Sequence, residues 1–338
     1  MRWRAMGVGL TAAVAMIGLA APATATTTCQ DVSVPAQLDL LLTVQVHGRL
    51  CVPAGADKVQ LLVHGATYDS RYWDEPVEGN LYSYVREATV DGWATLAVDL
   101  VGYGQSTKVP SATLTATTQA LVVHQLIGKL RAGTIGGHAF PRVLLSAHSV
   151  GGAEAVIETS LYNDADALAV SGMSHMLSVP QLLQTFTSGL HPVTLDPSPL
   201  ATQYDPGYLT TVPGTRGTLF YGPDPDPVMV AYDEATKGAI SGTEAADAIS
   251  LGFVLPTSRA VHIPVYLVLG DSDKLYCSAV LGTDCTDNAS LDAQERPYFA
   301  NASSFTAVVV PDSGHDVNLS PNAVSYETAL NTWADTHI

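Results

Sequence analysis

Short apolar runs alternate with longer stretches of helical spacing along most of the chain. The runs have no polar face, which is typical of strands that are covered by helices on both sides. Alternation of such strands with helices predicts an α/β fold with a mostly parallel central sheet. We expect strands at residues 59–63, 94–98, 142–146, 167–170, 265–269 and 306–310, and helices at residues 117–130, 150–161 and 322–333.

Two segments depart from this rhythm. Residues 43–53 are more mixed in polarity, and we expect them to form antiparallel strands at the opening of the fold. The stretch of about residues 174–260 is rich in Pro, Gly, Thr and Asp, and it is too long for a plain loop in a compact domain. We therefore predict one domain over residues 26–338, with an inserted lid of short helices and turns at about residues 174–260.

The first 25 residues have the pattern of a secretory leader. Arg2 and Arg4 precede an apolar run, and Ala23 and Ala25 supply the small residues that a signal peptidase requires. The run is at the short end for a membrane span and contains three glycines, so we expect cleavage rather than a single anchor. We predict a signal peptide at residues 1–25, a secreted, extracellular mature chain and no stable membrane anchor.

The charge of the chain restricts its partners. The formal net charge is −17, and removal of a leader with two arginines and no acids makes it −19. Such an acidic surface repels nucleic acid and anionic lipid headgroups. We therefore expect a small-molecule substrate and no nucleic-acid partner, while the oligomeric state stays open.

The four cysteines form one pair near the start of the chain and one pair late in it. In an exported protein an even number of locally paired cysteines indicates disulfides, and free thiols are the less common alternative. We predict that Cys29 bonds to Cys51 and that Cys277 bonds to Cys285. The spacings lack the tight pattern of zinc sites, and we predict no metal site.

Ser149 lies where the predicted strand at residues 142–146 meets the helix at residues 150–161. Small residues surround it in the run Ala147-His148-Ser149-Val150-Gly151, in which alanine replaces the first glycine of Gly-x-Ser-x-Gly. Such a turn lifts a serine hydroxyl above the sheet, and the helix N-terminus behind it stabilises negative charge. We predict that Ser149 is a nucleophile; the alternative is a plain junction between strand and helix.

A second strand end supplies the groups that would bind an oxyanion. The strand at residues 59–63 ends in His64-Gly65-Ala66. A loop at this place can aim a backbone N–H group at the oxyanion of an acyl-transfer intermediate. We predict the amides of Ala66 and Val150 as the two donors, with a simple turn at the strand end as the alternative.

Two later strand ends supply an acid and a base. Asp271 and Asp273 follow the strand at residues 265–269, and either can orient an imidazole. We favour Asp273 as the acid, with Asp271 as a turn or capping residue, and keep the reverse assignment as the alternative. His315 follows the last strand, where a loop can bring its ring over the edge of the sheet towards Ser149. Serine, aspartate and histidine therefore occur in that order at three strand ends.

These segments together resemble α/β-hydrolases of the serine esterase and lipase kind, over essentially the whole mature chain. The resemblance implies the α/β-hydrolase fold and a triad of Ser149, Asp273 and His315, which works through an acyl-enzyme without metal or organic cofactor. It assigns residues 99–106 to a structural turn. The matching segments are Val63-His64-Gly65, residues 99–106, the run around Ser149, Gly270-x-x-Asp273 and Ser313-Gly314-His315.

Hydrolysis of a carboxylic ester is the function that this resemblance favours. A lactonase or a peptidase or amidase would use the same triad and stays open as an alternative. A non-catalytic binding protein of the same fold is a more remote alternative, because the complete set of Ser, Asp and His argues against it. Haloalkane dehalogenases and epoxide hydrolases carry Asp at the position of Ser149, which disfavours them. The alanine-rich leader indicates a bacterial source of actinobacterial type.

Overall fold

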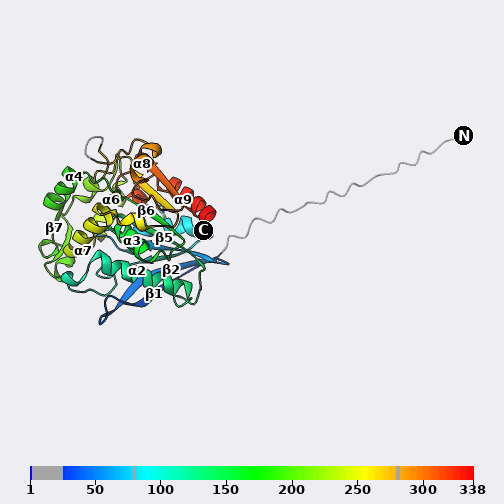
Figure 1. Ribbon diagram of the computed structural model, residues 1–338, viewed down its shortest axis with the longest axis horizontal. Helices are drawn as coiled ribbons and strands as arrows, with labels where there is room; N and C mark the ends of the chain where they lie inside the picture. Colours follow the sequence, from blue (N-terminus) through cyan, green and yellow to red (C-terminus); the bar gives the residue numbers. More distant parts are fainter. Residues whose placement is uncertain (2–25, 78, 80, 279–281) are drawn as a thin grey trace.

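The computed structural model describes the whole chain except residues 2–25, 78, 80 and 279–281 (Figure 1). The predicted signal peptide, residues 1–25, therefore lies outside the described residues apart from Met1. In the part of the chain that is described, no helix has the length and apolar character needed to cross a bilayer.

An eight-stranded sheet forms the centre of the fold in the order β1-β2-β4-β3-β5-β6-β10-β11. The pairs β1–β2 and β2–β4 are antiparallel, and the other neighbours are parallel. The predicted α/β fold with a mostly parallel sheet is therefore confirmed. The strands are β1 (Thr27–Gln37), β2 (Thr43–Pro53), β3 (Lys58–Val63), β4 (Ala94–Val98), β5 (Arg142–His148), β6 (Ala167–Ser171), β10 (Val265–Gly270) and β11 (Phe305–Val310).

Each strand that the apolar runs predict is present, with its ends shifted by no more than two residues. The sequence pattern did not predict β1. This strand lies at the edge of the sheet, and side chains such as Val34 and Ala36 are buried only in its second half. An edge strand exposed over half its length has no continuous apolar run, so its pattern resembles that of a loop.

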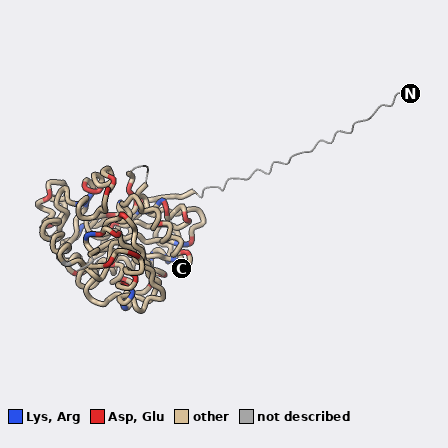
Figure 2. Tube along the Cα trace, turned by 90° about the horizontal axis from the view of Figure 1, so that it is seen from above, with Lys and Arg blue, Asp and Glu red and all other residues tan. Residues whose placement is uncertain are grey.

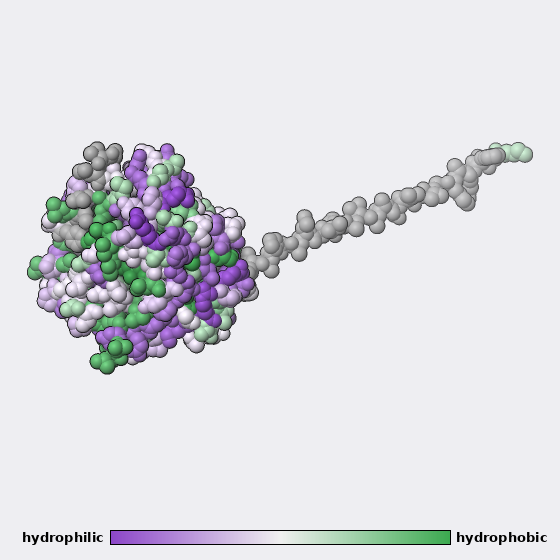
Figure 3. Space-filling model, viewed as in Figure 1, coloured by the Kyte–Doolittle hydropathy of each residue, from purple (hydrophilic) through white to green (hydrophobic). Residues whose placement is uncertain are grey.

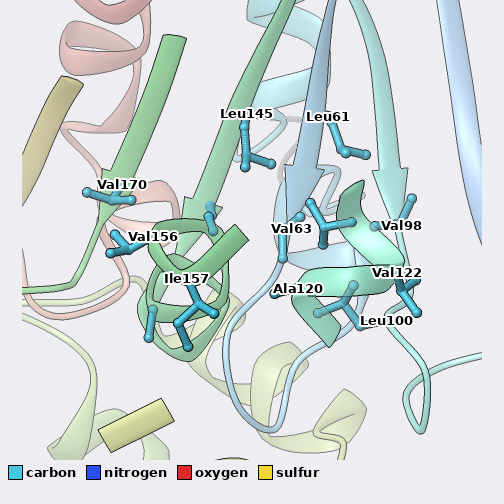
Figure 4. Close-up of a cluster of buried hydrophobic side chains, with 14 of the residues drawn as sticks. Leu61, Val63, Val98, Leu100, Ala120, Val122, Leu145, Val156, Ile157 and Val170 are labelled. Atoms are coloured by element: carbon cyan, nitrogen blue, oxygen red, sulfur yellow. The ribbon is translucent and has the colours of Figure 1, made fainter. Parts of the chain in front are cut away.

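Helices cover both faces of the sheet and create two apolar cores. Figure 4 shows the first core, in which Leu61 and Val63 of β3 point towards α2 and α3. Leu62, between them, belongs to the second core beneath α1 and α9, because successive side chains of a strand point to opposite faces. The helices are α1 (Tyr84–Val90), α2 (Ala116–Arg131), α3 (Ser149–Tyr162), α8 (Asn288–Glu295) and α9 (Ala323–His337).

The segment between β6 and β10, which we call the insertion (residues 172–264), occupies the left side of Figure 1. Besides the predicted short helices it contains an antiparallel sheet in the order β7-β8-β9, which the sequence pattern did not predict. Strands of two to four residues are too short to show alternation. Its elements are α4 (Val179–Gln184), β7 (Leu190–Pro192), β8 (Tyr208–Thr211), α5 (Arg216–Leu219), α6 (Pro227–Thr236), β9 (Ile240–Ser241) and α7 (Gly242–Asp247).

The remaining helical segments are short π-helices and 3-10 helices. Two of them, in the insertion, are π-helical and cover Thr185–Gly189 and Ala248–Val254. The others are 3-10 turns at Ser70–Trp73, Ser111–Thr113, Val193–Leu195, Pro199–Thr202, Pro256–Ala260 and Val317–Leu319.

Two disulfides join the cysteines in the predicted pairs. Cys29 and Cys51 lie opposite each other on β1 and β2. Cys277 and Cys285 close the segment that follows β10. Both bonds therefore link residues that are close in sequence, so each stabilises a local part of the fold.

The surface is acidic but not uniform. Acidic side chains outnumber basic ones along the described chain, and both kinds are dispersed (Figure 2). Apolar atoms are more frequent over the insertion than on the right of the molecule (Figure 3). They also cover the tip of the β1–β2 hairpin, where Leu40 and Leu41 are exposed.

Candidate active site

Ser149 stands at a sharp turn between β5 and α3. Its φ is +55°, a left-handed conformation that is uncommon for residues other than glycine. The turn lies tightly against the end of β3, because a Cβ atom at Gly151 would be 2.2 Å from the carbonyl oxygen of His64. A Cβ atom at Gly65 would likewise meet the Cβ of Ser149 at 2.9 Å. Glycine is needed at these two contacts, whereas Ala147 fits into the core beside α3.

The three residues predicted as a triad are joined by hydrogen bonds. The Nε2 atom of His315 lies 2.8 Å from the Oγ of Ser149, and its Nδ1 atom lies 2.9 Å from Oδ2 of Asp273. His315 and Asp273 are buried, and Ser149 is 9% exposed. Burial of His315 opposes its protonation, but the charge of Asp273 and the hydrogen bond to it outweigh burial and raise the pKa of the imidazole. The pair can therefore accept and hold a proton from Ser149.

The structure separates the two candidate acids. Asp273 is fully buried and accepts a hydrogen bond from the amide of Leu275 at 2.9 Å, besides its contact with His315. Asp271 is exposed and accepts a hydrogen bond from the amide of Asp312 at 3.0 Å. Asp273 thus faces the imidazole, and Asp271 joins the turns that follow β10 and β11.

The two predicted oxyanion donors line the same pocket as Ser149 and His315. Val150 belongs to the first turn of α3, where amides have no partner within the helix. Ala66 lies in the loop after β3, next to Thr67, whose φ is +62°. His64 braces this loop because its Nδ1 donates to the carbonyl of Gly65 and its Nε2 accepts from the amide of Leu100. Burial lowers the pKa of His64, which keeps this imidazole neutral, as both bonds require.

Comparison with known proteins identifies the family of this chain. A family profile described as "Alpha/beta hydrolase family" matches residues 60–327. The chain belongs to the alpha/beta hydrolase family. Among the curated proteins, none matches this hydrolase.

Solved structures resemble this alpha/beta hydrolase in fold but are distant in sequence. A thermophilic esterase from Thermogutta terrifontis has a TM-score of 0.62 at 16% identity, covering 91% of this chain and 100% of its own. A putative aryl esterase from Burkholderia cenocepacia has a TM-score of 0.61 at 14% identity, covering 91% and 99%. The enol-lactonase from Burkholderia xenovorans LB400 has a TM-score of 0.58 at 16% identity, covering 87% and 97%. At these identities the likeness shows the fold alone.

Ser149 lines an apolar pocket in this hydrolase. The core domain supplies the loop after β3, Ser149 and His315, whereas the insertion supplies most of the apolar wall. No Asp, Glu, Lys or Arg side chain is found among the described residues that line it. The lining consists of Ala66, Thr67, Tyr68, Ser149, Val150, Leu177, Thr185, Leu190, Phe220, Ile240, Ala245, Ile249, Phe253, Leu275, Tyr276 and His315.

A second histidine and a second acid lie beside the triad, and sequence reasoning gave neither of them a role in the site. The ring of His148 is stacked on Tyr72 with its centroid 4.9 Å from that of His315. Its Nε2 atom is 3.2 Å from Oδ1 of Asp316, whose other oxygen is hydrogen-bonded to the hydroxyl of Tyr68. Burial raises the pKa of the Asp316 carboxyl to about 6, against the effect of positive charge on His315 and Arg216. The only signal in the sequence is adjacency, since these residues flank Ser149 and His315.

Two groups of described residues bring imidazole nitrogens and carboxylate oxygens together as a metal site would. One is His148, His315 and Asp316, and the ring nitrogens of both histidines already have protein partners. The other is His124, Glu158 and Asp164 near the far end of α3. Burial and the neighbouring Asp164 raise the pKa of Glu158 to about 9, so this carboxyl is protonated at neutral pH.

Proposed function

We propose that this alpha/beta hydrolase is a serine hydrolase that cleaves carboxylic esters with an uncharged, apolar acyl group. The observation that carries the proposal is the hydrogen-bonded row of Ser149, His315 and Asp273, in which Ser149 and His315 line an apolar pocket. A serine that is hydrogen-bonded to a base, which is in turn oriented by a carboxylate, is the arrangement that activates a hydroxyl for attack on a carbonyl.

In the proposed reaction Ser149 Oγ attacks the ester carbonyl while Nε2 of His315 accepts the hydroxyl proton. The amides of Ala66 and Val150 donate hydrogen bonds to the oxyanion of the tetrahedral intermediate. His315 then donates its proton to the leaving alkoxide, and the acyl group stays on Ser149. A water molecule, deprotonated by His315, attacks the acyl-enzyme, and His315 returns this proton to Ser149 Oγ as the bond to the acyl group breaks and the acid leaves. Throughout, the Asp273 carboxylate stabilises the imidazolium.

The substrate class follows from the wall of the pocket. Burying a charged acyl group there would cost its hydration without a counter-ion in return. Each methylene of an apolar chain would instead gain about 0.8 kcal/mol on burial. We therefore propose a hydrocarbon acyl chain or an aryl group as the occupant, with the alcohol part directed away from this wall.

We also propose that the predicted lid region, about residues 174–260, covers this pocket. Seven apolar lining residues come from it: Leu177, Leu190, Phe220, Ile240, Ala245, Ile249 and Phe253. Substrate selection would then depend on the insertion, while the core domain provides the reacting groups.

A fluorophosphonate probe tests the nucleophile directly. We expect labelling of Ser149 in the wild-type protein and none in Ser149→Ala, with folding checked by circular dichroism. Ser146→Ala is the matched control, because Ser146 is buried on β5, the strand that leads to Ser149, with its hydroxyl 3.3 Å from Oε1 of Gln60. Normal turnover of an ester by Ser149→Ala would overturn the assignment.

A substrate panel then tests the bond that is cleaved. It contains p-nitrophenyl esters of increasing acyl length, charged succinyl esters, lactones and aminoacyl amides. We expect kcat/KM to rise with an apolar acyl chain and to fall by at least tenfold for the succinyl ester. Preference for a lactone or an amide over all esters would assign the same triad to a lactonase or an amidase, and labelling without any turnover would indicate a binding protein.

We further propose that the protein is exported and cleaved after Ala25. The leader sequence and two disulfides support this, because disulfides persist mainly outside the reducing cytoplasm. Expression in a secreting bacterial host, followed by amino-terminal sequencing of the protein in the medium, tests it. The expected first residue is Thr26. A variant with two aspartates in the apolar run should stay in the cell, and retention of the wild-type protein would contradict the proposal.

A further inference from the structure

Thr67 has an unusual conformation at an important position in the site. It follows Ala66, the proposed oxyanion donor, and its φ of +62° places it in the left-handed region. A β-branched residue is rarely found there, because its side chain clashes with the backbone. Such a conformation persists only where the surrounding structure enforces it. The contacts of Thr67 therefore show what holds the oxyanion loop in place.

The insertion contacts Thr67 at both its side chain and its backbone. Nη1 of Arg216 donates to the Thr67 hydroxyl at 2.9 Å, and the amide of Gly238 donates to the Thr67 carbonyl at 2.7 Å. Arg216 lies in α5, 149 residues further along the chain, and is fully buried. Thus the only arginine of α5 connects the insertion to the residue beside the proposed oxyanion donor.

Arg216 is itself held firmly. Its Nη2 atom forms an ion pair with Oδ1 of Asp233 at 2.7 Å. Its guanidinium lies over the ring of Tyr68 at 4.2 Å from the centroid, and over that of Phe220 at 5.2 Å. The hydroxyls of Tyr68 and Tyr221 each lie 3.2 Å from the second oxygen of Asp233. A planar group that is stacked and paired in this way has little freedom, so it fixes the position of the hydroxyl it binds.

We propose that Arg216 is a positioning residue that holds Thr67 in its left-handed conformation and thereby aims the Ala66 amide at the reacting carbonyl. This inference rests on the proposed serine hydrolase function. Because Arg216 belongs to the insertion, the oxyanion site is complete only when the insertion is docked on the core. Substrate binding beneath the insertion and assembly of the oxyanion site are then linked through one side chain.

The chain offers a matched pair of variants for the test. Nη1 of Arg216 also lies 3.4 Å from the hydroxyl of Thr211, which is buried on β8 of the insertion and does not line the pocket. Thr67→Val and Thr211→Val each remove one hydroxyl with little change of shape. Removing the guanidinium would leave Asp233 buried without its counter-ion, so loss of folding could be mistaken for loss of catalysis. The threonine variants avoid this difficulty.

We expect Thr67→Val to lower kcat by about 10-fold to 100-fold, somewhat less than the loss of an oxyanion donor, while KM changes less than about threefold. Binding of a trifluoromethyl ketone, which forms a tetrahedral adduct with the serine, should weaken by a similar factor. Thr211→Val should stay within about twofold of the wild type in both measurements. Binding of the carboxylic acid product, which needs no oxyanion site, should be unchanged in both variants.

Equal effects of the two variants, or an effect of Thr67→Val on KM alone, would overturn the positioning role. Arg216→Lys provides a second test, since it keeps the charge beside Asp233 but removes the fork that reaches Thr67. If it folds, adding Thr67→Val to it should cause no further loss of kcat. A wild-type protein that a fluorophosphonate does not label at Ser149 would overturn the proposed function itself. Normal labelling, with kcat unchanged in Thr67→Val, would overturn only the role of Arg216.

Discussion

Asp316, the residue after His315, lies 3.2 Å from the imidazole of His148, the residue before Ser149. The two neighbours of the proposed base and nucleophile are thus joined to each other, 168 residues apart in the chain. Burial, and then the charge of His315, lower the pKa of His148, so this imidazole is neutral and its Nε2–H can donate to the carboxylate. Asp316 therefore adds a second negative charge close to the ring of His315 besides that of Asp273.

This charge should influence the pH dependence of catalysis. His315 must be neutral to accept a proton, so kcat/KM falls at acid pH as the imidazole is protonated. Asp316 is among the groups that raise the pKa of His315, because its carboxylate stabilises the imidazolium. Asp316→Asn removes that charge, and we expect the acid limb of the kcat/KM profile to move to lower pH by about one unit. The measurement is a pH profile from pH 4.5 to 9 with an uncharged ester.

Asp271→Asn is the control for this profile. Asp271 is exposed and contacts the turn after β11. Its replacement by Asn therefore changes the net charge by the same amount as Asp316→Asn, but it does not alter the surroundings of His148 or His315. Its acid limb should coincide with that of the wild type. A profile of Asp316→Asn that also coincides with the wild type would show that Asp316 does not act on His315.

Asp271 and Asp273, the two acids that follow β10, give a prediction about the triad. Asp273→Asn keeps the shape of the side chain but no longer stabilises the imidazolium, so kcat should fall by about 10³–10⁴-fold. Asp271→Asn should lower kcat by less than about threefold. Steady-state kinetics of the two variants, with folding checked by circular dichroism, make the comparison. A larger loss in Asp271→Asn would reverse the assignment of the acid.

These two acids also show where sequence reasoning ends. The run around Ser149 and the strands of the sheet could be predicted because their signals are local: apolar runs, small residues and strand ends. Asp271 and Asp273 follow the same strand two residues apart, and only the path of the backbone after β10 decides which carboxylate faces His315. Sequence alone could therefore favour Asp273 but not separate the two.

Residues of the insertion were harder still to interpret. Arg216 occurs in a four-residue helix with no periodic pattern, and its partner Thr67 is 149 residues away. Nothing local marks such a contact, because it depends on how the insertion packs on the core. The β7-β8-β9 sheet was missed for a related reason, since pairing rather than composition stabilises its very short strands.

The pocket wall offers a test of substrate size. Ala245 of α7 lines the pocket, whereas Ala246, the next residue, is exposed to solvent. Ala245→Phe should fill part of the cavity and lower kcat/KM for a long acyl ester by about tenfold or more relative to a short one. Ala246→Phe adds the same group outside the cavity and should leave this ratio unchanged. Equal ratios in both variants would show that the acyl chain does not occupy the pocket.

A buried carboxyl of α9, outside the proposed triad, gives a prediction about stability. Glu327 of α9 is 1% exposed, and burial together with the negative charge of Glu87 raises its pKa to about 8, against the effect of Arg86. The folded protein therefore binds a proton at this group that the unfolded chain releases above about pH 4.5. Its contribution makes the free energy of unfolding fall as the pH rises from about 4.5 to 8.

Glu327→Gln removes this titration and keeps the shape of the side chain. At pH 5 the wild type carries a neutral Glu327 and should be about as stable as the variant. At pH 9 the wild type must ionise a buried carboxyl, so the variant should be more stable, by on the order of 4 kcal/mol. Urea unfolding at the two pH values measures the difference, and the pH 5 comparison separates the charge from any packing effect. A stability difference between variant and wild type that is the same at pH 5 and pH 9 would mean that Glu327 is ionised in the folded protein throughout this range.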